Sequence, residues 1–111
     1  MLAALENGVS QHADGSGRFP QVSGMRFSVD LAAEVGSRIS DVTVGGAPLD
    51  LAATYGVVSN NFVRNGGDGY DMFETAMNAY DFGPDLADVT AEYMAENAPY
   101  QPYVDGRIAI K

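Results

Sequence analysis

The chain has 111 residues, of which 46% are hydrophobic, so it can build the core of one small domain and is too short for two. Six basic and fifteen acidic residues give a net charge of −9, which argues against nucleic acid or an anionic membrane as partner because both require clustered Lys and Arg. The absence of cysteine excludes disulfides and thiolate chemistry, and no apolar run approaches the ~20 residues of a membrane span.

The N-terminal half is predicted to form a helix followed by strands. Residues 1–11 have the pattern of an amphipathic helix with one apolar face, and a chain that starts inside a helix is expected to be a piece of something longer. Strands are expected over 25–30, 39–44 and 55–59, with a primed turn at Gly45-Gly46. The apolar strand residues are interpreted as core: Phe27, Val29, Val42, Val44, Val57 and Val58.

The C-terminal half is predicted to contain two helices and a last strand. A short helix is expected over 72–79, and a clearer one over 85–96, with Asp85 as its N-cap. The second helix carries an apolar stripe and a solvated acidic face, and a strand is expected over 107–110. The predicted fold class is therefore α+β, with a mixed, mostly antiparallel sheet and packed helices.

The stretch 60–71 is the strongest candidate for a binding site. Three glycines and one carboxylate in Gly66-Gly67-Asp68-Gly69 predict a sharply bent loop that lets a ligand approach the backbone. Phe62 stands six residues before the acid. An aromatic face beside an acceptor-only carboxylate suits a flat ligand that carries hydroxyls. A hairpin turn with a core Phe62 is the alternative.

Other chemistries find little support in the sequence. The sole histidine, His12, lies in a Gly- and Ser-rich loop, with no acid or serine at a spacing that indicates catalysis. The chain also lacks the several His or Cys ligands that a zinc site needs. An EF-hand loop starting at Asn65 fails because glycines occupy positions that need oxygen ligands. The glycines fit neither a P-loop nor a dinucleotide fingerprint. Paired carboxylates for glycoside hydrolysis have no specific support.

The loop from Phe62 to Tyr70 resembles the nucleotide-binding loop in the C-terminal domain of the 5′-nucleotidases. That family includes 5′-nucleotidase/UDP-sugar hydrolases, 2′,3′-cyclic-nucleotide phosphodiesterases and ecto-5′-nucleotidases. The resemblance extends over essentially the whole chain, in matching order and spacing. The other matching segments are Leu5-Glu6-Asn7, 17–24, 46–50 followed by Tyr55, and Gly106-Arg107-Ile108.

The resemblance implies roles for individual residues. Phe62 corresponds to one ring of a two-ring clamp on the base, and Asp68 to the acceptor of the ribose hydroxyls. Gly66, Gly67 and Asn61 belong to the same loop, and Gly17 is expected to bring backbone near the base. The second stacking Phe and an Asn and Arg pair lie upstream of this chain in the family. Phe19 is assigned to packing.

The function implied is the nucleotide-binding domain of a metal-dependent phosphoesterase that hydrolyses nucleoside 5′-monophosphates or related phosphoesters. No catalytic residue or cofactor is expected within residues 1–111, which correspond to the C-terminal domain without its N-terminal end. The divalent metal pair belongs to a separate N-terminal metallophosphoesterase domain, so this chain alone is expected to be inactive. A stand-alone, non-catalytic binding module and a remnant without ligand are the alternatives.

Two further expectations concern the surroundings of the chain. The family resemblance implies an extracytoplasmic setting, periplasmic or secreted. Its partners would be a nucleotide substrate and the missing metallophosphoesterase domain. Uncovered sheet edges or an uncovered apolar face predict self-association of the chain when it is isolated.

Overall fold

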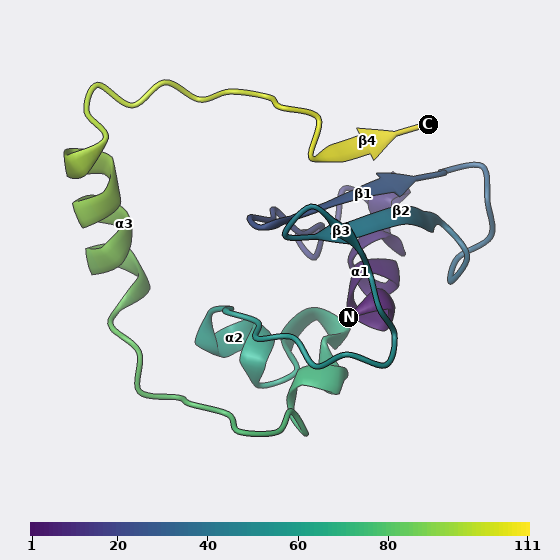
Figure 1. Ribbon diagram of the computed structural model, residues 1–111, viewed down its shortest axis with the longest axis horizontal. Helices are drawn as coiled ribbons and strands as arrows, with labels where there is room; N and C mark the ends of the chain where they lie inside the picture. The colour runs from purple at the N-terminus through teal and green to yellow at the C-terminus, as the bar shows by residue number, and fades with distance from the viewer.

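The computed structural model describes residues 1–111 and places four strands in one sheet (Figure 1). The sheet order is β3-β2-β1-β4, with β1 antiparallel to β2, β2 antiparallel to β3, and β4 parallel to β1. This confirms the predicted α+β class with a mixed, mostly antiparallel sheet. The strands are β1 (Met25–Val29), β2 (Ile39–Val44), β3 (Ala47–Pro48) and β4 (Ile108–Ile110). The helices are α1 (Leu2–Val9), α2 (Asn61–Arg64) and α3 (Leu86–Glu96), with 3₁₀ turns η1 (His12–Asp14), η2 (Gly67–Gly69) and η3 (Asp71–Phe73).

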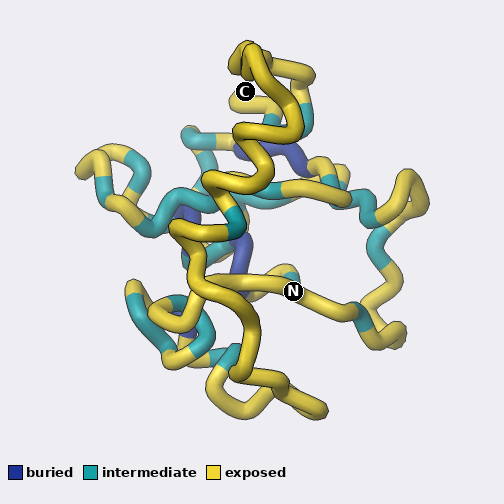
Figure 2. The backbone as a smooth tube through the Cα atoms, turned by 90° about the vertical axis from the view of Figure 1, so that its left-hand side faces the viewer, coloured by how far each residue is buried: buried dark blue, intermediate teal, exposed yellow.

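The core lies where α1 packs on the sheet. Leu5 and Val9 of the helix meet Phe27 and Val29 of β1, and all four side chains are buried. In Figure 2 the buried segments are confined mainly to this contact. Strand β1 is central, with β2 on one side and β4 on the other, and its pairing with β2 shifts register between Arg26 and Ser28. Helix α1 therefore determines which face of the sheet is covered.

Polar contacts fix α1 against the start of β2. The Glu6 carboxylate accepts hydrogen bonds from the backbone N–H groups of Arg38 (3.1 Å) and Ile39 (2.9 Å). In return, the Arg38 guanidinium donates to the carbonyl oxygens of Val9 (3.0 Å) and Ser10 (3.3 Å). These carbonyls would otherwise lack partners at the C-terminal end of the helix, so Arg38 caps it.

The predicted turn at Gly45-Gly46 is confirmed, whereas the prediction of a strand over 55–59 is wrong. Both glycines have positive φ (58° and 85°), as a two-residue primed turn requires. Residues 55–59 are not a strand, and Val57 and Val58 are exposed rather than core. A strand needs a neighbouring strand to satisfy its N–H and C=O groups, and the sheet ends at β3 on this side. High β-propensity alone does not replace that partner.

The helix predicted over 72–79 is also wrong. Only the 3₁₀ turn η3 forms there, and residues 77–85 run on without regular structure. Asn78 adopts a positive φ of 55°, which ends any helical path at that point. Without an apolar surface to pack against, so short a helix is not stable by itself.

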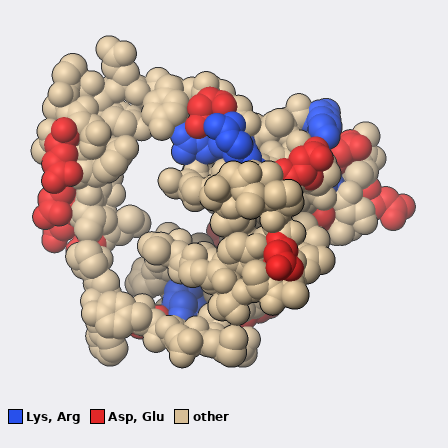
Figure 3. Space-filling view, viewed as in Figure 1, with Lys and Arg blue, Asp and Glu red and all other residues tan.

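Helix α3 forms as predicted but stands away from the sheet. Asp85 is its N-cap, and the carboxylate accepts from the backbone N–H of Ala87 at 2.8 Å. Figure 3 shows acidic side chains along its outer side and an open gap between the helix and the rest of the chain. The acidic face is exposed, and so is most of the apolar stripe: Leu86 (60%), Tyr93 (53%) and Met94 (45%).

The chain is therefore more open than its length predicts. Its radius of gyration is 15.0 Å, whereas a compact domain of this length has about 13 Å. Its accessible surface is 7869 Å², against about 5,900 Å² for a compact protein of the same mass. None of the helices has the length and hydropathy needed to cross a bilayer.

The exposed apolar stripe of α3 predicts self-association of the isolated chain. We expect the sedimentation coefficient to rise with protein concentration, because burying this surface between copies removes apolar area from water. Replacing Leu86 and Met94 together with Ser should weaken the association, whereas Ala91→Ser, at an exposed position of the same helix, should not. A monomer at every concentration would contradict this prediction.

Candidate functional site

The helix α2 places Phe62 at the edge of the glycine-rich loop. The helix begins after Asn60, whose side-chain oxygen accepts from the backbone N–H of Val63 at 2.8 Å. It ends at Asn65, whose side-chain amide donates to the carbonyl of Asn61 at 2.8 Å. Two asparagines thus close both ends of a single turn that is too short to be stable alone. The Phe62 side chain remains 56% exposed.

The backbone of the glycine-rich loop is bent as the sequence predicted. Gly66 and Gly69 have φ of 81° and 77°, in the left-handed region that glycine adopts without strain. Asp68 between them also has a positive φ of 55°, which is uncommon for a residue with a side chain. At Gly67 the need is for space: a Cβ there would lie 2.6 Å from the Phe62 ring and from the Phe62 carbonyl oxygen. The loop therefore packs directly under the aromatic ring.

Acidic side chains surround this loop. A Cβ on Gly66 would collide with the Glu74 carboxylate and lie 3.3 Å from a carboxylate oxygen of Asp71. The Asp68 side chain is exposed and makes no hydrogen bond or ion pair within the chain. The nearby Arg64 is committed to the fold, because it donates to the Phe73 carbonyl at 2.8 Å. The loop consequently offers acceptors and no free cation.

The loop is tied to α1 by contacts that span about half the chain. Asn7 donates from its side-chain amide to the Asp68 carbonyl at 3.0 Å, and Arg18 donates to the Asn7 side-chain oxygen at 3.3 Å. The Tyr70 hydroxyl donates to the Arg18 carbonyl at 2.7 Å. At Gly8, a Cβ would lie 2.7 Å from that same hydroxyl, so only glycine lets the helix approach so closely.

Tyr70 is the buried anchor of the loop. Its side chain is 6% exposed, and burial raises the pKa of its phenol above the ordinary value. Its ring stacks on Phe73, with centroids 5.8 Å apart and planes 4° from parallel. A neutral hydroxyl that donates to a backbone carbonyl is the stable form in this environment.

The structure brings five of the six predicted site residues together. Phe62, Gly66, Gly67 and Asp68 lie in one helix-and-loop segment in which Gly67 packs against Phe62, and Asn61 begins the helix that carries Phe62. Gly17 lies in the turn after η1 and is exposed, and nothing lies within 4 Å of where its Cβ would be. The contact from that region comes instead from its neighbour Arg18. Phe19 packs against the core, as predicted.

Sequence reasoning missed Asn7, Gly8, Arg18 and Tyr70. A signal was present at the first two, because Asn and Gly are weak helix formers and yet stand inside α1. Such residues inside a helix indicate a packing or hydrogen-bonding demand from another part of the chain. No local pattern indicates that the partner is 61 positions away.

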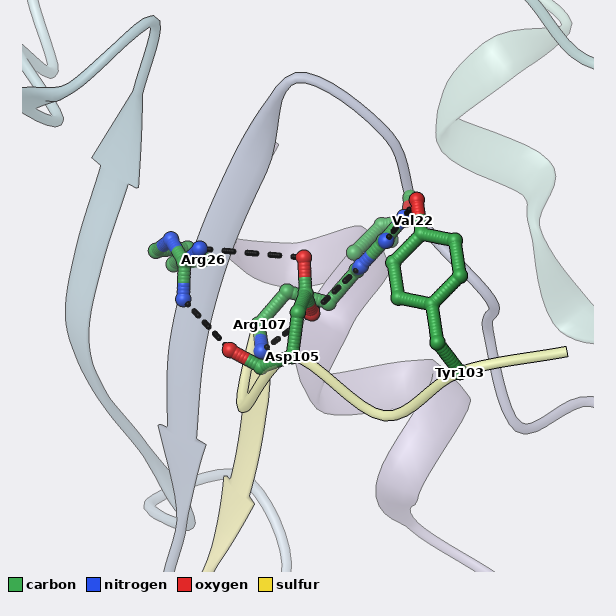
Figure 4. Close-up of polar contacts among 5 residues, drawn as sticks. All are labelled: Val22, Arg26, Tyr103, Asp105 and Arg107. Carbon is green, nitrogen blue, oxygen red and sulfur yellow. Dashed lines mark hydrogen bonds and ion pairs between the residues drawn. The ribbon is translucent and has the colours of Figure 1, made fainter.

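A second polar cluster joins the C-terminal segment to β1 (Figure 4). Arg107 donates to the Asp105 carboxylate at 2.8 Å, to the Val22 carbonyl at 3.0 Å and to the Tyr103 hydroxyl at 3.0 Å. Arg26 donates to the Asp105 carbonyl at 3.1 Å. The hydrogen bond from Arg107 lowers the pKa of the Asp105 carboxyl. These groups are engaged with one another, so the cluster holds β4 in place.

The family of the chain follows from a comparison with known domains. The family model described as "5′-nucleotidase, C-terminal domain" matches residues 1–75, which include α1, most of the sheet and the Phe62 loop. The chain belongs to the 5′-nucleotidase family. The sequence-based resemblance is thereby confirmed.

Relatives in this family match nearly the whole chain. The trifunctional nucleotide phosphoesterase protein YfkN of Bacillus subtilis is 37% identical over 111 residues, 95% of this chain and 8% of that protein. A snake venom 5′-nucleotidase of Macrovipera lebetinus is 30% identical over 113 residues, 95% of this chain and 28% of that protein. The crystal structure of a 5′-nucleotidase precursor from Thermus thermophilus superimposes with a TM-score of 0.92 at 46% identity, covering 98% of this chain. The chain thus spans less than a third of the length of these proteins, and 22% of the crystallised one.

The superposition also shows that the position of α3, away from the sheet, is shared with the crystallised relative. Because the superposition covers 98% of the chain, the openness of the fold is shared with a 5′-nucleotidase family member of much greater length. Between α3 and the sheet lies a hollow of about 710 Å³ with a largely apolar lining that includes Tyr93, Tyr100 and Val104. None of the helices or strands of this chain fills the hollow.

The contact of Gly67 with Phe62 gives a direct test of the loop packing. Gly67 does not have a positive φ, so an alanine there is disfavoured only by the steric collision of its Cβ. We expect Gly67→Ala to lower the free energy of unfolding by about 1–3 kcal/mol, because its Cβ collides with the Phe62 backbone. Gly83→Ala, where nothing lies within 4 Å, is the control and should leave stability unchanged or slightly raised. Equal results for both variants in urea unfolding would contradict the packing described.

Proposed function

We propose that the chain is the nucleotide-binding domain of a metal-dependent phosphoesterase that hydrolyses nucleoside 5′-monophosphates or related nucleotide phosphoesters. The observation that carries the proposal is that one bent, glycine-rich segment presents an exposed Phe62 ring and an exposed Asp68 carboxylate that has no partner within the chain. Membership in the 5′-nucleotidase family and the names of the relatives support it.

In this proposal the loop holds the nucleoside by two contacts. The base stacks on Phe62, an interaction of about 1–3 kcal/mol that tolerates any base. The ribose hydroxyls donate to Asp68, and hydrogen bonds to a charged acceptor contribute roughly 1.5–3 kcal/mol each before desolvation. Gly66 and Gly67 keep the loop surface free of side chains. Asn61 supports Phe62 through α2.

The electrostatics of the loop favour the sugar over the phosphate. Each of the six basic side chains makes hydrogen bonds or ion pairs within the chain, although Arg18 makes its bond to Asn7 next to the loop: Arg18, Arg26, Arg38, Arg64, Arg107 and Lys111. The carboxylates of Asp68, Asp71 and Glu74 would repel a phosphate. The phosphate is therefore proposed to point away from this chain.

The hydrolytic step is assigned to another domain. No group of three or more His, Cys, Asp or Glu side chains in residues 1–111 is arranged to hold a metal ion, so the metal pair does not fit here. We place it in an N-terminal metallophosphoesterase domain, and we expect this chain alone to be inactive. An extracytoplasmic setting is part of the proposal, supported by family members that include a snake venom 5′-nucleotidase.

Substitution of the two binding residues tests the proposal. In the full-length enzyme, Phe62→Ala and Asp68→Ala should each raise KM for adenosine 5′-monophosphate by about one to two orders of magnitude, on the magnitudes above. A smaller effect on kcat is expected, because neither residue is placed at the reacting phosphate. Steady-state kinetics measures both constants.

Matched controls lie on exposed parts of the same chain. Phe82→Ala removes another exposed ring (83% exposed), and Asp88→Ala removes another exposed carboxylate on α3. Both should keep the KM of the unmodified enzyme. Unchanged KM in Phe62→Ala and Asp68→Ala would refute the site, and binding without hydrolysis by the full-length protein would favour a non-catalytic module.

A further inference from the structure

The side chain of Asn7 connects α1 to the one residue of the loop that carries the proposed sugar contact. Its amide nitrogen lies 3.0 Å from the Asp68 carbonyl oxygen, across 61 positions of sequence. We propose that Asn7 is a positioning residue that sets the direction of the Asp68 carboxylate for recognition of the ribose hydroxyls. This inference rests on the proposed function, and it assigns Asn7 no contact with the ligand.

Asp68 needs such support because of its backbone conformation. Its φ of 55° and ψ of 28° lie in the left-handed region, where a residue with a Cβ is less stable than in the ordinary regions. A conformation of this kind persists when surrounding contacts hold it in place. The hydrogen bond from Asn7 ends on the carbonyl of Asp68 itself, so it acts on the peptide plane that follows the strained residue.

The orientation of the Asn7 amide is fixed by its other end. The side-chain oxygen accepts from the Arg18 guanidinium at 3.3 Å, and the same guanidinium nitrogen lies 3.4 Å from the Ser10 hydroxyl oxygen. With the oxygen facing a cation, the nitrogen must face Asp68, which presents only a carbonyl oxygen there. The Asn7 oxygen also lies 2.8 Å from where a Cβ of Gly69 would be, so the loop and the helix are in close contact.

The residues on either side of Asp68 are held by other contacts. Gly67 lies beneath the Phe62 ring, and Tyr70 is anchored through its hydroxyl to the Arg18 carbonyl at 2.7 Å. Asp68 and Gly69 are the two exposed residues between these fixed points, and Asp68 is the one with a side chain. Loss of the Asn7 hydrogen bond should therefore leave the loop in place and free the Asp68 peptide to rotate.

The variant Asn7→Asp removes the donor with little change in shape. One carboxylate oxygen can still accept from Arg18, whereas the other faces the Asp68 carbonyl without a proton to share. In the full-length enzyme we expect KM for adenosine 5′-monophosphate to rise roughly threefold to tenfold, the equivalent of one hydrogen bond. KM for 2′,3′-dideoxyadenosine 5′-monophosphate should not change, because that substrate has no ribose hydroxyl for Asp68 to accept from.

The substrate pair separates positioning from a general structural role. If Asn7 only fastened the loop to α1, both substrates would be affected alike, because the Phe62 stacking surface would move as well. An unchanged kcat with the dideoxy substrate reports that the variant is folded. Asn7→Ala is measured in parallel, so that a folding defect specific to the new carboxylate does not decide the outcome.

The control is Asn97→Asp. Asn97 also donates its side-chain amide to a backbone carbonyl, that of Tyr93 at 2.8 Å, at the end of α3. It undergoes the same chemical change at a distance from the loop, and both KM values should stay as they are. Equal KM values for Asn7→Asp and the unmodified enzyme with adenosine 5′-monophosphate would overturn the proposal.

A double variant distinguishes failure of this inference from failure of the proposed function. When Asp68→Ala raises KM for adenosine 5′-monophosphate, adding Asn7→Asp should raise it no further, because Asn7 acts through Asp68. Additive effects would overturn the positioning role while leaving the Asp68 assignment intact. If Asp68→Ala itself has no effect, the proposed function fails first, and the inference fails with it.

Discussion

The packing of α1 is the contact on which the rest of the structure depends. Through Leu5 and Val9 the helix covers the apolar face of the sheet, and through Asn7 and Gly8 it meets the loop that carries Asp68. No other helix of the chain touches both parts in this way. With only eight of 111 residues buried, the small core around α1 supports both the sheet and the position of the loop.

Arginine side chains make many of the hydrogen bonds that hold this open chain together. Apart from Arg18, each guanidinium donates to at least one backbone carbonyl: Arg26, Arg38, Arg64 and Arg107. Irregular segments leave carbonyl oxygens without helix or sheet partners, and a guanidinium with five donors can satisfy several of them at once. The same commitment explains how an acidic chain retains an uncompensated carboxylate at Asp68. The guanidinium groups stabilise the rest of the fold, and the loop is left with hydrogen-bond acceptors.

The elements that could be predicted from the sequence are those set by local chemistry. The helix of α3 follows from Asp85 and a 3.6-residue pattern, and the hairpin follows from Gly45-Gly46. The bent loop at 66–69 follows from its glycines. The prediction of a strand over 55–59 failed because a strand depends on a neighbouring strand, which the local sequence does not reveal. The ties from Asn7 and Tyr70 to distant residues were missed for the same reason, since neither has a partner within reach of a sequence pattern.

The parallel pairing of β1 with β4 has a consequence for how the chain is made. Phe27 pairs with Ile108, so the central strand receives its second neighbour only from residues about 80 positions further on. During synthesis, β1 and β2 can form their hairpin as soon as they leave the ribosome, while the other side of β1 stays open until the residues of β4 emerge. Contacts between residues so far apart slow folding. Until β4 emerges, the chain thus presents an unpaired edge next to its core, which β4 then closes and the Arg107 cluster holds in place.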